Sequence, residues 1–340
     1  MPWEGKDFRM AETYDGRSAS IIARDDNIDE IRAKYPNGLH FVVGDLHGER
    51  ETLRLLLQKI RFDPQKDCVF FVGDYNAGGN PRALLSLLSE HFTEGYDQPG
   101  FHLIRGNHER ELCPQYTLEN LPDVIVFKSP VMQYYIVHAG MVAKAFDLIN
   151  WDMENEPERK VFAYRLDDSC AAYDKPLRQL IWSRRGLYSQ RSRWHSWPSE
   201  EELREHSACI IHGHTPYCFF SPKTYSTYGD LSLVWQNQRV WFSEDLQSFN
   251  IDSNVKGRYE NGESYRGLSC ICLEVLDEIA SASGGTLRRD ELQRGPNAVF
   301  SVAYAPNAPF YYGTDISPLL DARPPMKTIA LDPDGFLTLT

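Results

Sequence analysis

Three short stretches decide the fold of this chain: FVVGDLHGE (41–49), VFFVGDYNAGG (69–79) and HLIRGNHER (102–110). Each begins with an apolar run, passes through a glycine and ends in an acidic or amide residue. Continuous apolar runs suit strands that are buried on both faces of a sheet. The residues that follow them then lie on loops at the strand ends, where open α/β sheets bind their ligands. We therefore expect one rim of a sheet to carry a metal site made from Asp45, His47, Asp74, Asn107 and His108.

The segments between these stretches have helical patterns. Residues 49–60 carry leucines at helical spacing, and Pro81 stands where a second helix over 82–91 would begin. Strand, helix, strand, helix and strand alternate in this way in parallel βαβ units. The pattern also predicts a helix near 27–34, beginning at Asp26 or Asn27. Further strands are predicted at 123–127, 131–137, 208–211, 231–242, 247–251 and 268–275.

The composition is that of a soluble globular protein, with 42% hydrophobic and 25% charged residues among 340. No apolar run is long enough to span a membrane, and the N-terminus lacks the apolar segment of a signal peptide. We therefore expect a cytoplasmic protein with no membrane partner. A net charge of -12 argues against nucleic acid as a partner. The sequence leaves the oligomeric state open.

Cysteine usage agrees with a reducing compartment, because the seven cysteines are scattered and odd in number. No pair of them has the spacing of a structural zinc site. Cys270 and Cys272 lie in the apolar run LSCICLEV, where a strand would place both side chains on one face. We interpret them as buried hydrophobic residues.

Six side chains at the ends of apolar runs can bind metal. Carboxylate, imidazole and amide groups together suit Mn, Fe or Zn. Asp74 can bridge two ions, and two ions held 3.5–4 Å apart, a typical spacing, would share a bridging hydroxide that attacks phosphorus. His108 would then be available as a general acid for the leaving oxygen. The six predicted ligands are Asp45, His47, Asp74, Asn107, His138 and His214.

At this point the motifs are recognisable. GDLHG, GDYNAGG, RGNHE, VHAG and HGHTP resemble the five signature motifs of the phosphoprotein phosphatase family of binuclear metallophosphoesterases, in a divergent form like its bacterial or phage members. The resemblance covers about 38–276 and implies an α/β/β/α sandwich, with two central mixed sheets flanked by helices. It leaves 1–37 as an N-terminal extension and 277–340 as a C-terminal extension that packs on the core or is partly mobile. We interpret the aromatic, charged segment 150–205 as a helical cap or groove wall.

The resemblance also assigns roles. Asp45, His47 and Asp74 resemble the ligands of the first metal ion. Asp74, Asn107, His138 and His214 resemble those of the second, with Asp74 bridging and His108 as the general acid. Two divalent ions, Mn²⁺ before Fe or Zn, are the expected cofactors. LIWSRRG (180–186) resembles the block that supplies a phosphate-binding arginine, for which Arg184 is the better match and Arg185 the reserve.

The second motif departs from the family pattern GDxVDRG. Ala77 replaces the acid that orients the general acid, and Gly78 replaces an arginine that binds the substrate phosphate. Losing such a charge-assisted contact weakens phosphate binding unless another cation substitutes. Arg105, Arg110 and Arg185 are candidates for that substitution.

Three functions remain open. The leading prediction is a phosphatase for phosphoserine or phosphothreonine, and also phosphotyrosine, with a phosphoprotein as partner. The alternative is a bis(5'-nucleosyl)-tetraphosphatase, a class similar in motifs that also carries alanine at the position of Ala77. That class usually keeps the arginine and ends the third motif in Asp, where this chain has Gly78 and Glu109. The second alternative is a metal-retaining binding module with weakened catalysis.

Overall fold

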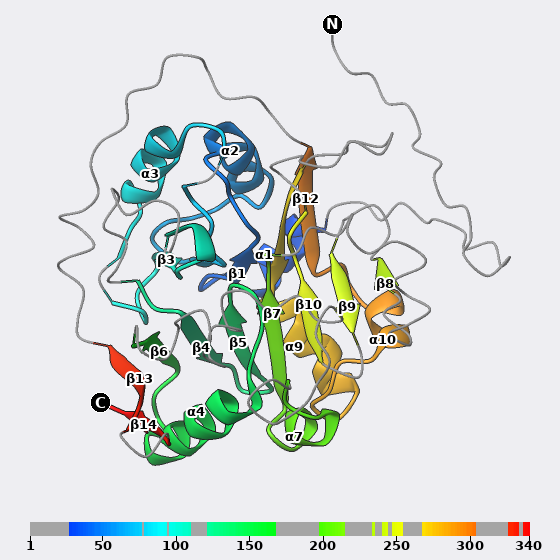
Figure 1. Cartoon of the computed structure of the whole chain (residues 1–340). Helices are drawn as coiled ribbons and strands as arrows, with labels where there is room; N and C mark the ends of the chain where they lie inside the picture. Colours follow the sequence, from blue (N-terminus) through cyan, green and yellow to red (C-terminus); the bar gives the residue numbers. More distant parts are fainter. Residues whose placement is uncertain are drawn as a thin grey trace, which may run out of the picture.

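The computed structural model describes residues 27–76, 78–93, 95–109, 121–167, 197–214, 233–234, 240–243, 247–253, 267–303, 326–332 and 336–340. Within these ranges the chain forms two mixed sheets that lie face to face, with helices on their outer sides (Figure 1). This is the predicted α/β/β/α arrangement. None of the helices in the same ranges is long and apolar enough to cross a membrane.

The first sheet is built around the three opening motifs. Its strands, in spatial order, are β12 (Val299–Ala303), β11 (Gly267–Cys272), β1 (His40–Val43), β2 (Cys68–Phe71) and β3 (Gly100–Leu103). β1, β2 and β3 are parallel, as the alternation of strands and helices predicts, whereas β11 runs antiparallel to β1. Every residue of β2 and β3 is buried, which explains their continuous apolar runs.

The second sheet is larger. In spatial order it contains β14 (Leu337–Leu339), β13 (Lys327–Leu331), β6 (Val161–Leu166), β4 (Val124–Lys128), β5 (Gln133–Val137), β7 (Ala208–His212), β10 (Ser248–Asn250), β9 (Trp241–Ser243) and β8 (Leu233–Val234). β5 and β7 are parallel. Both therefore end at the same edge, which is where two of the five motifs leave the sheet.

Two hydrophobic cores follow from the alternation of side chains along the strands. In β4, Ile125 and Phe127 point into the core between the sheets, whereas Val124 and Val126 join a second core on the outer face. The helices that cover these faces are α1 (Ile28–Lys34), α2 (Arg50–Lys59), α3 (Pro81–Ser89), α4 (Ala143–Asn155), α7 (Glu200–Glu205), α9 (Leu273–Ala282) and α10 (Arg289–Arg294). Figure 1 shows α2 and α3 beside the first sheet, and α4 and α7 beside the second.

Three parts of the chain differ from the sequence-based expectation. The strand predicted at 268–275 ends at Cys272, because Leu273–Ala282 forms α9. Within 150–205, Val161–Leu166 forms β6 rather than a helix, because its alternate residues pack into both cores. The expected limit of the catalytic domain at residue 276 falls inside α9, and β12 and β13 beyond it pair with β11 and β6. Described residues after 276 thus complete both sheets.

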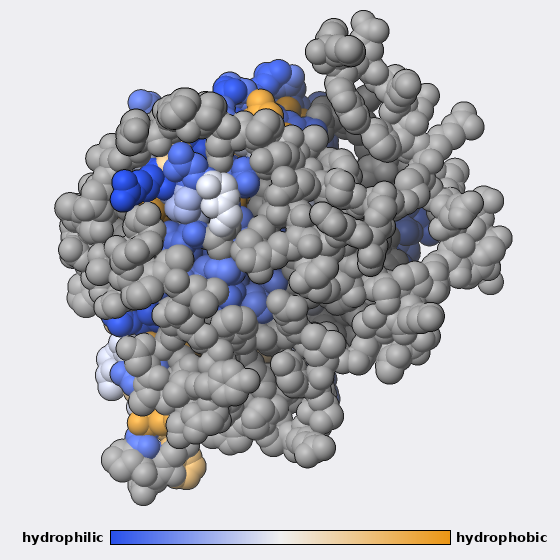
Figure 2. All heavy atoms as spheres, turned by 45° about the horizontal axis from the view of Figure 1, so that its top comes forward, coloured by the Kyte–Doolittle hydropathy of each residue, from blue (hydrophilic) through white to orange (hydrophobic). Residues whose placement is uncertain are grey.

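The described surface is mostly polar. In the view of Figure 2, most of the described residues that reach the surface are hydrophilic. Trp151 on α4 and Phe336 next to β14 are the exposed large hydrophobic residues in the described part of the chain. Cys270 and Cys272 are fully buried in β11, as predicted.

Candidate metal centre

Five loops at one end of the two sheets bring the predicted site residues together. They follow the carboxyl ends of β1, β2, β3, β5 and β7, and carry Asp45, His47, Asp74, Asn107, His108, His138 and His214. All of these residues except His108 are buried. The side chain of His108 keeps 12% of its surface exposed, so it is the most accessible of the group. The structure therefore confirms that the seven residues meet at one rim, and their individual roles stay predictions.

Three of the loops turn sharply at a predicted ligand. The backbone φ angle is 46° at His47, 58° at Asp74 and 67° at His214. A side chain in this left-handed region costs about 1–3 kcal/mol and persists only where its surroundings hold it. Here the His47 amide donates to the Asp74 carbonyl at 2.6 Å, and the His214 amide donates to the Asp45 carboxylate at 3.0 Å. The ligand loops therefore hold one another.

Two motif glycines make room for the carboxylates. A Cβ atom on Gly106 would lie 2.4 Å from Oδ1 of Asp74, and one on Gly213 would lie 1.9 Å from Oδ1 of Asp45. Neither carboxylate can move away without leaving the cluster. The glycines of RGNHE and HGHTP are thus required by close packing against the predicted ligands.

The tautomer of His138 is set by the backbone. Its Nδ1 lies 2.8 Å from the carbonyl oxygen of Val72, which can only accept, so Nδ1 carries the proton. Burial lowers the pKa of His138 to about 4, although the Val72 hydrogen bond acts in the opposite direction. The imidazole is therefore neutral, and the lone pair on Nε2 points into the cluster. A histidine held this way by a carbonyl is the usual arrangement for a metal ligand.

Nε2 of His138 faces two other ligand atoms. It lies 2.8 Å from Oδ1 of Asn107 and 3.1 Å from Nδ1 of His214, and the latter two atoms are 2.9 Å apart. Oδ1 of Asp74 is 3.4 Å from the same Nε2. Two atoms that each bind one ion at about 2.1 Å are separated by roughly 3 to 4 Å. This group therefore matches a single first-row divalent ion.

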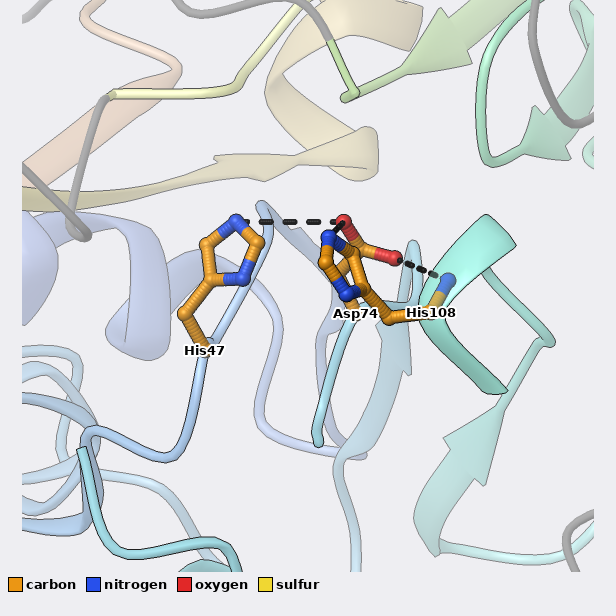
Figure 3. Close-up of side chains that lie close together, drawn as sticks. All are labelled: His47, Asp74 and His108. Atoms are coloured by element: carbon orange, nitrogen blue, oxygen red, sulfur yellow. Dashed lines mark hydrogen bonds and ion pairs between the residues drawn. The ribbon is translucent and has the colours of Figure 1, made fainter. Parts of the chain in front are cut away.

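The other oxygen of Asp74 serves a second group. Oδ2 of Asp74 lies 3.8 Å from Nε2 of His47 and 3.7 Å from Nε2 of His108, and Figure 3 shows the three side chains converging. Oδ2 of Asp45 lies 3.9 Å from Nε2 of His47. Because the two oxygens of Asp74 face different groups, the carboxylate is placed to bridge two ions.

Negative charge is concentrated at this rim. Burial, followed by the charges of Asp252 and Asp74, raises the pKa of Asp45 well above its usual range. Burial and the charge of Asp74 likewise raise the pKa of Glu109 to about 7. Buried carboxylates in such a cluster are stabilised by bound cations. The donor set and the charge therefore both fit divalent ions.

Glu109 and Asp252 are site residues to which the motif analysis assigned no role. Both are buried next to predicted ligands, at 4% and 2% exposure. Glu109 closes the motif RGNHE, and Asp252 lies two residues after the end of β10. Asp252 lies two residues after a buried strand, as Asp45 does, so the signal that identified Asp45 could have pointed to it.

Of the three arginines predicted to bind phosphate, only Arg105 lies within the described residues. Arg105 is buried and pairs with Asp123, donating from Nε at 3.0 Å and from Nη2 at 2.7 Å. Asp123 also accepts from the amide of Leu166, so the pair joins β3 to β6. Arg184 and Arg185 lie outside the described residues, as do Ala77 and Arg110.

Gly78 also has a structural role in its own loop. Its φ angle is 110°, and a Cβ atom there would lie 2.7 Å from the carbonyl oxygen of His47. The loop between Asp74 and α3 thus packs directly on the first motif. A side chain at this position would therefore disturb the loop conformation of this chain.

Comparison with known proteins identifies the family of this chain. The family model of calcineurin-like phosphoesterases matches residues 41–218, more than half of the chain. The chain therefore belongs to the calcineurin-like phosphoesterase family, and is a metallophosphoesterase. The family and the His/Asp cluster together imply bound divalent metal ions.

Several curated relatives are symmetrical bis(5'-nucleosyl)-tetraphosphatases. The one from Yersinia pseudotuberculosis is 34% identical over 237 residues, covering 69% of this chain and 68% of the relative. The one from Shewanella frigidimarina is 31% identical over 160 residues, covering 39% of this chain and 55% of the relative. Among solved structures, a protein serine/threonine phosphatase from Saccharomyces cerevisiae matches with a TM-score of 0.45 and 15% identity. That match covers 83% of this chain and 84% of the other.

Proposed function

We propose that this chain hydrolyses a phosphoanhydride bond in dinucleoside polyphosphates. The observation that carries the proposal is the 34% identity with the Yersinia tetraphosphatase over two thirds of both chains. The motifs alone favour a phosphoprotein substrate, but this similarity favours the alternative. With a dinucleoside tetraphosphate, water would add to a phosphorus atom, the bridging oxygen would leave, and two nucleoside diphosphates would form.

The metal ions would be held in two groups that share Asp74. When bound, they supply Lewis-acid stabilisation of the phosphate oxygens and lower the pKa of water. Asp45 and His47 would complete one group, and Asn107, His138 and His214 would complete the other. His108, the most accessible side chain of the cluster, would protonate the leaving oxygen.

The altered second motif agrees with an anhydride substrate. Ala77 removes the carboxylate that would orient His108, which weakens a general acid. An alkoxide leaving from serine is a strong base and needs that proton, whereas a leaving nucleoside diphosphate is a much weaker base. A site that keeps all six predicted metal ligands but has a weakened general acid thus suits a nucleoside diphosphate as the leaving group.

A phosphoprotein phosphatase is the second candidate. Glu109 keeps the ending of the third motif that phosphoprotein phosphatases have, where tetraphosphatases usually have Asp. The phosphate site in either case would need a cation in place of the missing arginine, and Arg110 and Arg185 remain the proposed sources beside the pair of Arg105 with Asp123.

The test uses the purified full chain with added Mn²⁺. Diadenosine tetraphosphate, a phosphopeptide panel and p-nitrophenyl phosphate are assayed side by side, with Asp74→Asn as the inactive control. We expect turnover of the dinucleotide, with ADP as the sole nucleotide product. Turnover of phosphopeptides alone would establish the second candidate instead. If wild type binds Mn²⁺ but turns over none of them, while a biological activity persists in Asp74→Asn, the chain acts as a binding module.

A further inference from the structure

The carboxylate of Glu109 is the centre of a network that the proposed reaction does not use. Oε2 accepts from the amides of Asp74 at 2.8 Å and Gly106 at 3.0 Å. Oε1 accepts from the amides of Tyr75 at 2.7 Å and Asn76 at 3.1 Å. Three consecutive amides of one ligand loop, and one amide of another, thus converge on a single buried group.

The contact is reciprocal. The backbone amide of Asp74 donates to Glu109, and Oδ1 of Asp74 accepts from the backbone amide of His108 at 3.1 Å. Glu109, His108 and Asn107 follow one another on the same turn after β3. A Cβ atom on Gly106 would lie 2.9 Å from Oε2 of Glu109, so the glycine leaves the space for this approach.

We propose that Glu109 is a positioning residue that sets the separation of the two metal positions. Its carboxylate holds the Asp74 loop against the turn that carries Asn107 and His108. Asp74 faces both groups of ligand atoms, so a shift of its loop changes both at once. This inference rests on the ligand roles in the proposed function, but not on the identity of the substrate.

In this chain the clamp uses a carboxylate of this length. Four amide donors meet two acceptor oxygens, and each oxygen accepts two of them. In Glu109→Gln, one oxygen becomes an NH₂ group, which cannot accept from the amides it would face. In Glu109→Asp, the charge is kept, but the side chain is one methylene shorter and cannot make all four bonds with the loops placed as they are in this chain.

Asp67 offers a matched control at the other end of β2. It is also a fully buried carboxylate that accepts two backbone amides, from Leu39 at 2.9 Å and from Asp63 at 2.8 Å. It pairs with Arg32 and contacts none of the predicted ligands through the hydrogen bonds described. Asp67→Asn therefore reports what losing a buried clamp does to stability alone.

The experiment measures Mn²⁺ binding to the wild type, Glu109→Gln, Glu109→Asp and Asp67→Asn by calorimetry, with folding checked by circular dichroism. Loss of a group that orients metal ligands typically weakens metal affinity or activity by about 10- to 100-fold. We expect that loss in both Glu109 variants, and wild-type affinity in Asp67→Asn. At saturating Mn²⁺, kcat should stay reduced in the Glu109 variants while KM for the substrate changes little.

The outcomes separate this inference from the proposed function. Failure of the wild type to bind Mn²⁺ would remove both. If folded Glu109→Gln and Glu109→Asp bind Mn²⁺ as wild type does, the inference alone is wrong. If neither Glu109 variant folds while Asp67→Asn does, Glu109 is a folding residue and the positioning role is likewise rejected.

Discussion

Restoring the missing arginine of the second motif should harm this protein rather than improve it. In Gly78→Arg, the new Cβ atom would lie 2.7 Å from the carbonyl oxygen of His47, at a φ angle of 110°. The backbone strain costs about 1–3 kcal/mol. The new side chain also overlaps the carbonyl oxygen of His47, which belongs to a ligand loop. Strain and overlap together should lower the free energy of unfolding by roughly 2–4 kcal/mol. With about 2.1 cal/mol/K of unfolding entropy per residue, Tm should fall by about 3–6 °C.

The assay is thermal unfolding of the metal-free protein, followed by phosphate binding in Mn²⁺. Gly78→Ala is the matched variant, because it introduces the same Cβ atom without the guanidinium group. Gly284→Ala separates strain from overlap, since Gly284 has a φ angle of 74° and nothing lies within 4 Å of its added Cβ atom. We expect Gly78→Ala and Gly78→Arg to lose similar stability, and Gly284→Ala to lose less. A Gly78→Arg protein as stable as wild type, with tighter phosphate binding, would refute the reasoning.

Four further outcomes are expected. Asp123→Ala removes the carboxylate that compensates the charge of the buried Arg105. This variant should lower the free energy of unfolding by about 3–5 kcal/mol, measured by urea titration. A loss below about 1 kcal/mol would contradict the pairing. Mn²⁺ at about 100 times its Kd should raise the free energy of unfolding of the wild type by roughly 2.7 kcal/mol per site. Asp74→Asn should lose most of this stabilisation. Equal stabilisation of the two proteins would exclude Asp74 as a ligand. Burial raises the pKa of Asp277 to about 6, against the lowering effect of its hydrogen bonds from Tyr134 and Ser129. Between about pH 4 and 6 the folded state therefore binds more protons than the unfolded state. The free energy of unfolding, relative to that of Asp277→Asn, should fall as pH rises through that window. Parallel pH profiles of the two proteins would show that Asp277 titrates as it does in the unfolded chain. Both polar atoms of the Asn76 side chain are buried without a hydrogen bond in the described structure. Asn76→Val should thus raise the free energy of unfolding by about 1 kcal/mol, and a loss in calorimetry would show that the amide is used.

The sequence predicted that the site residues meet at one rim, because its signals are local. Each ligand follows a buried strand within a few residues, so the strand ends alone place Asp45, Asp74 and His138 at one edge. The parallel direction of β1, β2 and β3 follows from the helices between them. The cluster could therefore be assembled from short motifs and general rules of topology.

The parts that were missed depend on contacts between distant residues. β6 lies in a charged, aromatic region, and it becomes a strand because β4 and β13 pair with it on either side. Lys327, the first residue of β13, pairs with Asp152 at 2.7 Å, and no local sequence pattern predicts this contact. The change from β11 to α9 occurs at Leu273 inside one apolar run, without a glycine or proline to mark it.

The role of Glu109 was invisible for a different reason. Its partners are backbone amides, and amides are present at every position except proline. Only the three-dimensional course of the Asp74 loop shows that four of them meet at one carboxylate. A residue that binds the main chain leaves no partner residue type in the sequence.

The left-handed turns at His47, Asp74 and His214 have one further consequence. Hydrogen bonds between the loops hold these turns, so we expect an ion to bind with little ordering of the chain. Ions should then enter and leave by simple exchange with the solvent, without opening of the fold. We expect the metal content of the isolated protein to follow the supply of divalent ions during growth, rather than a selection made by the loops.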